Sequence, residues 1–128
     1  MKQTKVEARP TNSTPLVSVA VATCNGVETL QRALESVVLQ DYPCLDIIIC
    51  DDGSTDGSRA ICQEYSKRYT NIRYVENEEN LGIIENYKKL FRLGKGKYFL
   101  WADQDDVRES SFISKCVAVL ESDENAVL

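Results

Sequence analysis

The chain has 128 residues, of which 43% are hydrophobic, so it is long enough for one domain with a modest core. Its net charge of −5 argues against a protein that binds nucleic acid through a basic face, and no apolar run approaches the roughly 18 residues of a membrane span. Five cysteines and no histidine disfavour a zinc site, a disulfide framework and Ser-His or Cys-His nucleophile pairs, and they favour a reducing, cytoplasmic location.

Apolar and polar residues alternate in blocks that predict strands and helices in turn. Residues 1–15 are polar and contain two prolines, so we expect a disordered leader there. Short apolar runs predict strands at 16–22, 45–50, 72–75 and 97–102, and residues 126–128 look like the start of a fifth strand. Helical spacing of apolar residues predicts a helix after each of the first four strands. This alternation predicts an α/β fold with a mostly parallel sheet and right-handed crossovers.

The segments that follow the predicted strands are polar: "TCNG", "DDGSTDG", "ENEENLG" and "ADQDD". In an open α/β sheet, ligands bind beyond the carboxyl ends of the strands. A single aspartate there often caps the next helix, which is how we interpret Asp56. Repulsion among several neighbouring carboxylates must be offset by protonation, solvent or a cation. Oxygen ligands without histidine favour Mg²⁺ or Mn²⁺, which would bridge to a phosphorylated ligand. The carboxylates concerned are Asp51, Asp52, Asp103, Asp105 and Asp106.

Two common phosphate-binding motifs are absent from the sequence. There is no G-x-x-x-x-G-K-[ST] and no G-x-G-x-x-G after the first strand, which argues against a P-loop hydrolase and a dinucleotide-binding fold. A nucleotidyltransferase would need a loop rich in glycine and basic residues after that strand, and "TCNGVETLQR" lacks that density. Two alternatives stay open: a nucleotidyltransferase of related fold, and a module that binds nucleotide or metal without catalysis.

Four segments, in this order and spacing, resemble the start of a family 2 glycosyltransferase with the GT-A fold. They are "VSVAVATCNGVETLQRALESVVLQDYP", "DIIICDDGSTDGS", "ENLGIIENY" and "GKYFLWADQDD". The pairing of "DDGSTD" after the second strand with D-x-D-D after the fourth carries most of the specificity. The resemblance covers residues 16–128 and implies a truncated, Rossmann-like three-layer α/β/α sandwich. It would be the donor-binding half of an enzyme whose acceptor-binding half is missing.

The resemblance implies transfer of a sugar from a nucleoside-diphosphate donor to a saccharide or lipid-linked acceptor, with inversion and with Mg²⁺ or Mn²⁺. Asp52 would accept a hydrogen bond from the base, which favours UDP- or dTDP-linked donors, and Asp51 would brace the turn. Asp103 would approach the ribose or a metal-bound water. The residues implied for the nucleotide sugar are Thr23, Asn25, Asp52, Asn80, Gly82 and Asp103. Those implied for the metal are Asp103, Asp105 and Asp106.

Two positions depart from the family pattern. Cys24 stands where an aromatic residue is frequent, and Arg108 stands where Trp is frequent after D-Q-D-D. We expect Trp101 and Tyr98 to be core residues rather than a sugar platform, because they lie inside the fourth strand. The resemblance places the catalytic base in the missing half, so no base is assigned in this chain. A full-length protein could work at the inner face of the membrane.

Overall fold

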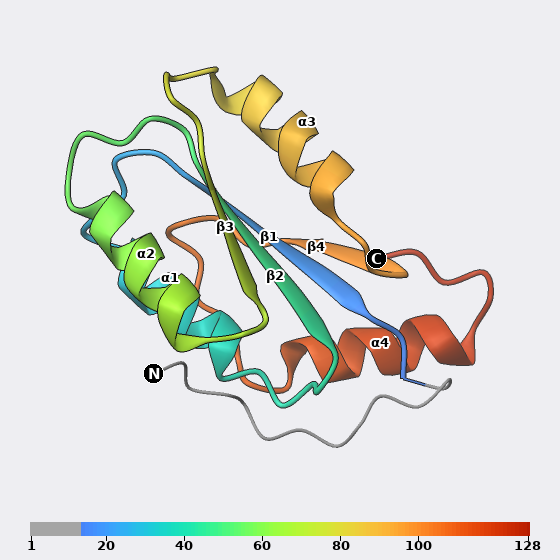
Figure 1. Cartoon of the computed structure of the whole chain (residues 1–128). Coiled ribbons are helices and arrows are strands. Elements are labelled where there is room, and N and C mark those ends of the chain that lie inside the picture. Colours follow the sequence, from blue (N-terminus) through green and yellow to red (C-terminus); the bar gives the residue numbers. More distant parts are fainter. Residues whose placement is uncertain (1–13) are drawn as a thin grey trace.

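The computed structural model describes residues 14–128, so the leader expected at residues 1–15 lies outside the described residues except for Thr14 and Pro15. Strands and helices alternate along the described chain, as the hydrophobic pattern predicted (Figure 1). The strands are β1 (Val17–Thr23), β2 (Leu45–Asp51), β3 (Ile72–Glu76) and β4 (Tyr98–Trp101). The helices are α1 (Leu30–Val38), α2 (Ser58–Arg68), α3 (Ile83–Leu93) and α4 (Phe112–Ser122).

The strands form one parallel sheet in the order β3-β2-β1-β4. Val17 of β1 pairs with Leu45 of β2 on one side and with Tyr98 of β4 on the other. β1 and β2 are rich in valine and isoleucine and are almost completely buried, as expected for strands covered on both faces. Because β2 and β3 lie on one side of β1 and β4 on the other, a crevice opens at the carboxyl ends, where such sheets bind ligands.

Helices cover both faces of the sheet (Figure 1). α3 lies on one face, where Leu90 packs in a small cluster with Ala20, Ile48 and Cys50. α1, α2 and α4 lie on the other face and share the main core with the strands. This is the three-layer α/β/α sandwich that the resemblance implied. None of the helices in residues 14–128 is both long enough and apolar enough to cross a membrane.

Two large apolar residues of α3 lie outside its buried face. Ile84 is 67% exposed and Phe91 is 64% exposed, whereas Asn86 and Leu90 are buried. The sheet surface under this helix includes Ala20, Ile48 and Cys50, and a buried group of polar side chains lies beside it. Asn86 therefore turns inward to join those polar groups, and part of the apolar stripe faces solvent.

One expectation about a chain segment needs correction. The fifth strand expected at residues 126–128 does not form, and the Ala126 N–H instead donates to the Asp123 carbonyl at 3.0 Å in a turn. α3 ends at Leu93, and Gly94 follows it with a φ of −64°, outside the left-handed region. Close packing explains the other glycine of this segment, because a Cβ on Gly96 would lie 2.5 Å from the backbone nitrogen of Ser18.

Candidate functional site

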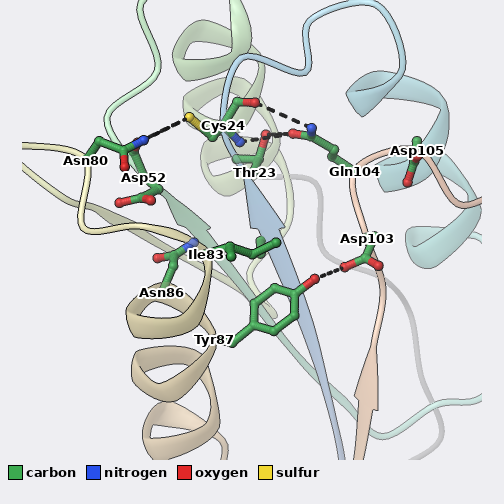
Figure 2. Close-up of a pocket in the computed structure, with 11 residues that line it drawn as sticks. Thr23, Cys24, Asp52, Asn80, Ile83, Asn86, Tyr87, Asp103, Gln104 and Asp105 are labelled. Atoms are coloured by element: carbon green, nitrogen blue, oxygen red, sulfur yellow. Dashed lines mark hydrogen bonds between the residues drawn. The ribbon is translucent and has the colours of Figure 1, made fainter.

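A cavity of about 360 Å³ opens at the carboxyl ends of the strands (Figure 2). The end of β1, the turn after β2, the loop after β3, the first turn of α3 and the loop after β4 all contribute to it. Its lining residues are Ala22, Thr23, Cys24, Asp52, Asn80, Ile83, Asn86, Tyr87, Asp103, Gln104 and Asp105. The polar segments that the sequence places after separate strands therefore converge on one site.

Asp52 is 3% exposed, yet its carboxylate lines the cavity. Its Oδ1 accepts hydrogen bonds from Asn77 Nδ2 at 3.0 Å and from the Leu81 N–H at 2.7 Å. Its Oδ2 accepts from the Gly82 N–H at 3.0 Å. A carboxylate has about four acceptor positions, so one position on Oδ2 remains for a ligand.

Asp51 has a different role from its neighbour. Its side chain is fully buried and does not line the cavity. Oδ1 accepts from the backbone N–H of Ser54 at 3.1 Å and from the Ser54 hydroxyl, and Oδ2 accepts from the Tyr74 hydroxyl at 3.3 Å. Burial and a hydrogen bond to Glu76 raise the pKa of Tyr74, which keeps its hydroxyl a donor. Asp51 thus braces the turn, in agreement with the sequence analysis.

The loop after β3 closes over Asp52. Asn80 Nδ2 donates to the Asp52 carbonyl at 3.1 Å and lies 3.4 Å from Cys24 Sγ. Asn80 Oδ1 and Asp52 Oδ2 both accept from the Gly82 N–H, each at 3.0 Å. Gly82 has a φ of +91°, a conformation in which L side chains are strained, so glycine suits this position. Asn80 lines the cavity itself, whereas Gly82 supports it through its backbone.

Gln104 connects the loop after β4 to the loop after β1, a role that we did not predict for it. Its Oε1 accepts from the Thr23 hydroxyl at 2.8 Å and from the Cys24 N–H at 3.0 Å. A Cβ on Gly26 would lie 2.3 Å from that same oxygen. The glycine of "TCNG" thus leaves room for Gln104. A glycine after β1 and a glutamine within "ADQDD" were the sequence features from which this contact could have been predicted.

Asn25 does not line the cavity, although the resemblance implied that it borders the base. Its φ is +51°, in the left-handed region that asparagine tolerates. Its Oδ1 accepts from the Thr55 N–H at 2.8 Å, and its own N–H donates to the Ser54 hydroxyl at 2.9 Å. In this structure Asn25 joins the loop after β1 to the turn after β2.

Asp56 binds a backbone N–H at the start of α2, as a capping carboxylate would, although the N-cap residue itself is Gly57. Its Oδ1 accepts from the Ser58 N–H at the start of α2 at 2.9 Å, and its Oδ2 accepts from the Val27 N–H at 3.2 Å. The hydrogen bonds from Ser58 hold the pKa of this carboxyl below its ordinary value. Asp56 is therefore explained by structure and does not belong to the cavity.

The aspartates after β4 are arranged unequally. Asp103 and Asp105 line the cavity, but Asp106 does not, and its Oδ2 lies 3.8 Å from Arg108 Nη2. Asp103 Oδ1 accepts from the Tyr87 hydroxyl at 2.7 Å (Figure 2). That hydrogen bond, with burial, raises the pKa of Tyr87 to about 12.

The structure does not bring the three expected metal ligands together. In the described part of the chain, no three acidic or cysteine side chains lie close enough to form a complete metal site. Asp103 and Asp105 still present oxygen donors at the same cavity. A hard divalent cation often takes only one or two carboxylates from the protein and fills its other positions with water and phosphate oxygens. The two residues therefore fit such an ion if a ligand supplies the rest.

The residues that depart from the family pattern also have clear places. Cys24 lines the cavity, its thiol donates to the Asp52 carbonyl at 3.4 Å, and burial raises its pKa. Arg108 Nη2 donates to the Trp101 carbonyl at 2.8 Å, which ties the acidic loop to the end of β4. The Trp101 ring stacks on Tyr87 with centroids 4.7 Å apart, and it packs with the small core cluster as expected.

Comparison with known proteins decides the family. The family model "Glycosyl transferase family 2" matches residues 18–128. The chain belongs to glycosyltransferase family 2. An uncharacterized glycosyltransferase of Haemophilus influenzae is 36% identical over 111 residues, which are 87% of this chain and 34% of the relative. Chondroitin synthase of Escherichia coli is 32% identical over 116 residues, which are 91% of this chain and 17% of that protein.

Solved structures show the same fold as this family 2 chain. TarS residues 1–349 from S. aureus gives a TM-score of 0.76 at 25% identity, over 84% of this chain and 32% of that one. The mannosyltransferase PcManGT from Pyrobaculum calidifontis, in complex with GDP-Man and Mn²⁺, gives a TM-score of 0.77 at 24% identity. This match covers 85% of this chain and 33% of PcManGT. The truncated GT-A fold is therefore confirmed, and the chain spans about a third or less of these proteins.

Proposed function

We propose that the protein transfers a sugar from a nucleoside-diphosphate donor to an acceptor hydroxyl, with inversion and with Mg²⁺ or Mn²⁺. The observation that carries this proposal is one cavity with a buried carboxylate on one side and two open carboxylates on the other (Figure 2). The family supports the reaction class. TarS in complex with UDP-GlcNAc and PcManGT with GDP-Man and Mn²⁺ support a nucleotide-sugar ligand.

Asp52 is proposed to recognise the base. Its one remaining acceptor position suits a ring N–H, which uracil and thymine present at N3 and cytosine does not; guanine presents two adjacent donors, N1–H and the N2 amino group, which would need two acceptors. UDP- or dTDP-linked sugars are therefore the favoured donors. Thr23 would border the base, and the loop held by Asn80 and Gly82 would cover the nucleotide. The contacts of Asn25 with Thr55 suggest that it shapes this region from outside the cavity.

The aspartates after β4 are proposed to bind a metal ion that contacts the diphosphate of the donor. Asp103 and Asp105 would hold the ion, and Asp106 remains our proposed third ligand even though its carboxylate faces Arg108. When bound, the ion would stabilise the negative charge of the leaving nucleoside diphosphate. Tyr87 would keep Asp103 in place through its hydrogen bond.

The catalytic base and the acceptor site are proposed to lie outside these residues. Glu121 is unsuitable as a base, because its carboxylate accepts from Lys97 Nζ at 2.9 Å and from the Tyr98 hydroxyl at the opposite end of β4. The similar proteins described above are at least about two and a half times as long as this chain. A saccharide or lipid-linked acceptor would bind to such an additional part. The five free cysteines support a cytoplasmic location.

Two experiments test the proposal. Calorimetry with a panel of nucleoside diphosphates, with and without Mn²⁺, should show the tightest binding for UDP or dTDP with the ion. Sugar transfer to added acceptors should then appear with the full-length protein and be poor or absent with these 128 residues. Binding without transfer by the full-length protein would indicate a non-catalytic module, and no binding of any nucleotide would overturn the proposal.

A further inference from the structure

A chain of buried polar side chains connects Asp52 to a lysine on α3. Lys89 Nζ donates to Asn77 Oδ1 at 2.6 Å, and Asn77 Nδ2 donates to Asp52 Oδ1 at 3.0 Å. Asn77 Nδ2 also donates to Asn86 Oδ1 at 3.0 Å, and Asn86 Nδ2 donates to the Cys50 carbonyl at 3.2 Å. The two asparagines are 4% and 2% exposed, so these contacts lie inside the protein.

Each end of this chain fixes the direction of the hydrogen bonds. A lysine ammonium only donates, and an ionised carboxylate only accepts, whereas an asparagine amide has one end of each kind. Asn77 satisfies both neighbours only with its oxygen toward Lys89 and its nitrogen toward Asp52. The opposite orientation would place two acceptors together at Asp52 and two donors together at Lys89. Asn86 is fixed in the same way by the Cys50 carbonyl.

The orientation of Asn77 in turn determines what Asp52 offers to a ligand. Asn77 and the Leu81 N–H occupy the two positions of Oδ1, so the open position falls on Oδ2. We propose that Lys89 is a positioning residue for base recognition, acting through the amide of Asn77 to hold Asp52 with one free acceptor position toward the base. This inference rests on the proposed function, in which Asp52 reads a ring N–H.

The neighbouring lysine provides a matched control. Lys88 is on the same helix, but its side chain is 58% exposed and pairs with Glu85 at 3.2 Å on the surface. It has the same charge and length as Lys89 and no part in the buried chain. Lys88→Met and Lys89→Met therefore remove the same chemical group, and only the second removes the contact with Asn77.

The first measurement compares UDP with CDP, whose ring lacks the N3–H, by calorimetry with Mn²⁺ on the full chain. Lys89→Met should weaken UDP binding about tenfold, the scale of one hydrogen bond to a charged group, and leave CDP binding nearly unchanged. The UDP preference should therefore fall. Lys88→Met should keep both affinities within about twofold. Lys89→Arg, which retains a donor, should recover part of the preference.

The second measurement needs no ligand. Amide hydrogen exchange at Leu81 and Gly82, whose N–H groups bind Asp52, should be faster in Lys89→Met than in Lys88→Met. If wild type binds no nucleotide, the proposed function fails, and this comparison still decides whether Lys89 positions Asp52. Equal exchange and an equal UDP preference in the two variants would overturn the inference, even if Lys89→Met lowered the overall stability.

Discussion

The two sides of the cavity differ in how completely the protein has organised them. On the base side, Asp52 is buried and receives three hydrogen bonds from the chain. On the acidic side, Asp103 receives one hydrogen bond from Tyr87, Asp105 is exposed, and Asp106 faces Arg108. The first side is shaped before any ligand arrives. The second holds unneutralised charge, which a cation and a diphosphate could organise further.

The position of the strands explains the difference. Asp52 follows β2, which has neighbours on both sides and is nearly all buried. Asp103 follows β4, which stands at the margin of the described sheet, is four residues long and is only partly buried. A loop after a buried central strand is held by neighbours on every side, whereas a loop after a short marginal strand has fewer contacts and can adapt to a ligand.

Removing the ion should have the largest effect and should act on the acidic side alone. Like unit charges about 4 Å apart repel by about 4 kcal/mol at the effective dielectric of a protein surface. UDP should therefore bind up to about 1,000-fold more weakly in EDTA than in Mn²⁺, measured by calorimetry. Asp105→Asn should reduce this dependence on Mn²⁺, and Glu109→Gln, on an exposed residue nearby, should not. Equal affinity in both conditions would exclude the metal bridge.

Asp52→Asn should test whether Asp52 contacts the base while Asp51 only supports the turn. The variant loses its charge, and the NH₂ end of its amide cannot accept the N–H that a carboxylate oxygen accepts there, so UDP affinity should fall by about 1–2 kcal/mol, or roughly 5–30-fold. Mn²⁺ affinity should change little. Asp51→Asn is the comparison, because Asp51 is buried within the turn. It should lower the free energy of unfolding by about 1–3 kcal/mol and affect UDP less. The reverse pattern would show that the two roles are exchanged.

Tyr87→Phe should loosen the acidic side without altering the core. The phenyl ring can still stack on Trp101, but Asp103 loses the hydrogen bond that the Tyr87 hydroxyl donates to it. Loss of such a supporting hydrogen bond should weaken Mn²⁺ binding in the presence of UDP about tenfold. UDP affinity in EDTA and the melting temperature should stay close to wild type. Tighter Mn²⁺ binding would mean instead that Tyr87 competes with the ion for Asp103.

Sequence patterns were sufficient for the fold and for the polar edge of the sheet. The valine-rich run of β1 and the polar turn "DDGSTDG" act locally, so their structure could be predicted from neighbouring residues. The partners of the site side chains could not. Gln104 meets Thr23 across 81 positions, and Lys89 reaches Asp52 only through Asn77. No rule of residue spacing predicts such contacts, because they depend on how loops that are distant in the sequence pack against one another.

The orientation of individual carboxylates was also beyond local reasoning. Asp103, Asp105 and Asp106 are adjacent in the sequence, yet Asp106 leaves the cavity because the loop turns, with its N–H donating to the Asp103 carbonyl at 3.2 Å. Asn25 turns toward Thr55 for a similar reason, since its positive φ redirects the side chain. The roles assigned to these residues remain predictions.

Gly26→Ala should have the smallest effect and should act where the two sides meet. The new Cβ would lie 2.3 Å from Gln104 Oε1, so the flexible glutamine side chain would move and release Thr23 and the Cys24 N–H. The loss of neutral hydrogen bonds near the surface should weaken UDP binding about threefold. Gln104→Ala should give a similar decrease, and the double variant should add little. Additive losses would show that Gly26 acts independently of Gln104.

The strand order also determines the order in which the two sides of the site can fold during synthesis. Chains emerge from the ribosome with the N-terminus first, and β1, β2 and β3 can pair as soon as residues up to Glu76 are available. β4 must then return to the free side of β1, and the contact between Thr23 and Gln104 closes a span of 81 residues. The half of the site that would recognise the base can thus exist on a growing chain before the half that would hold the diphosphate has been synthesised.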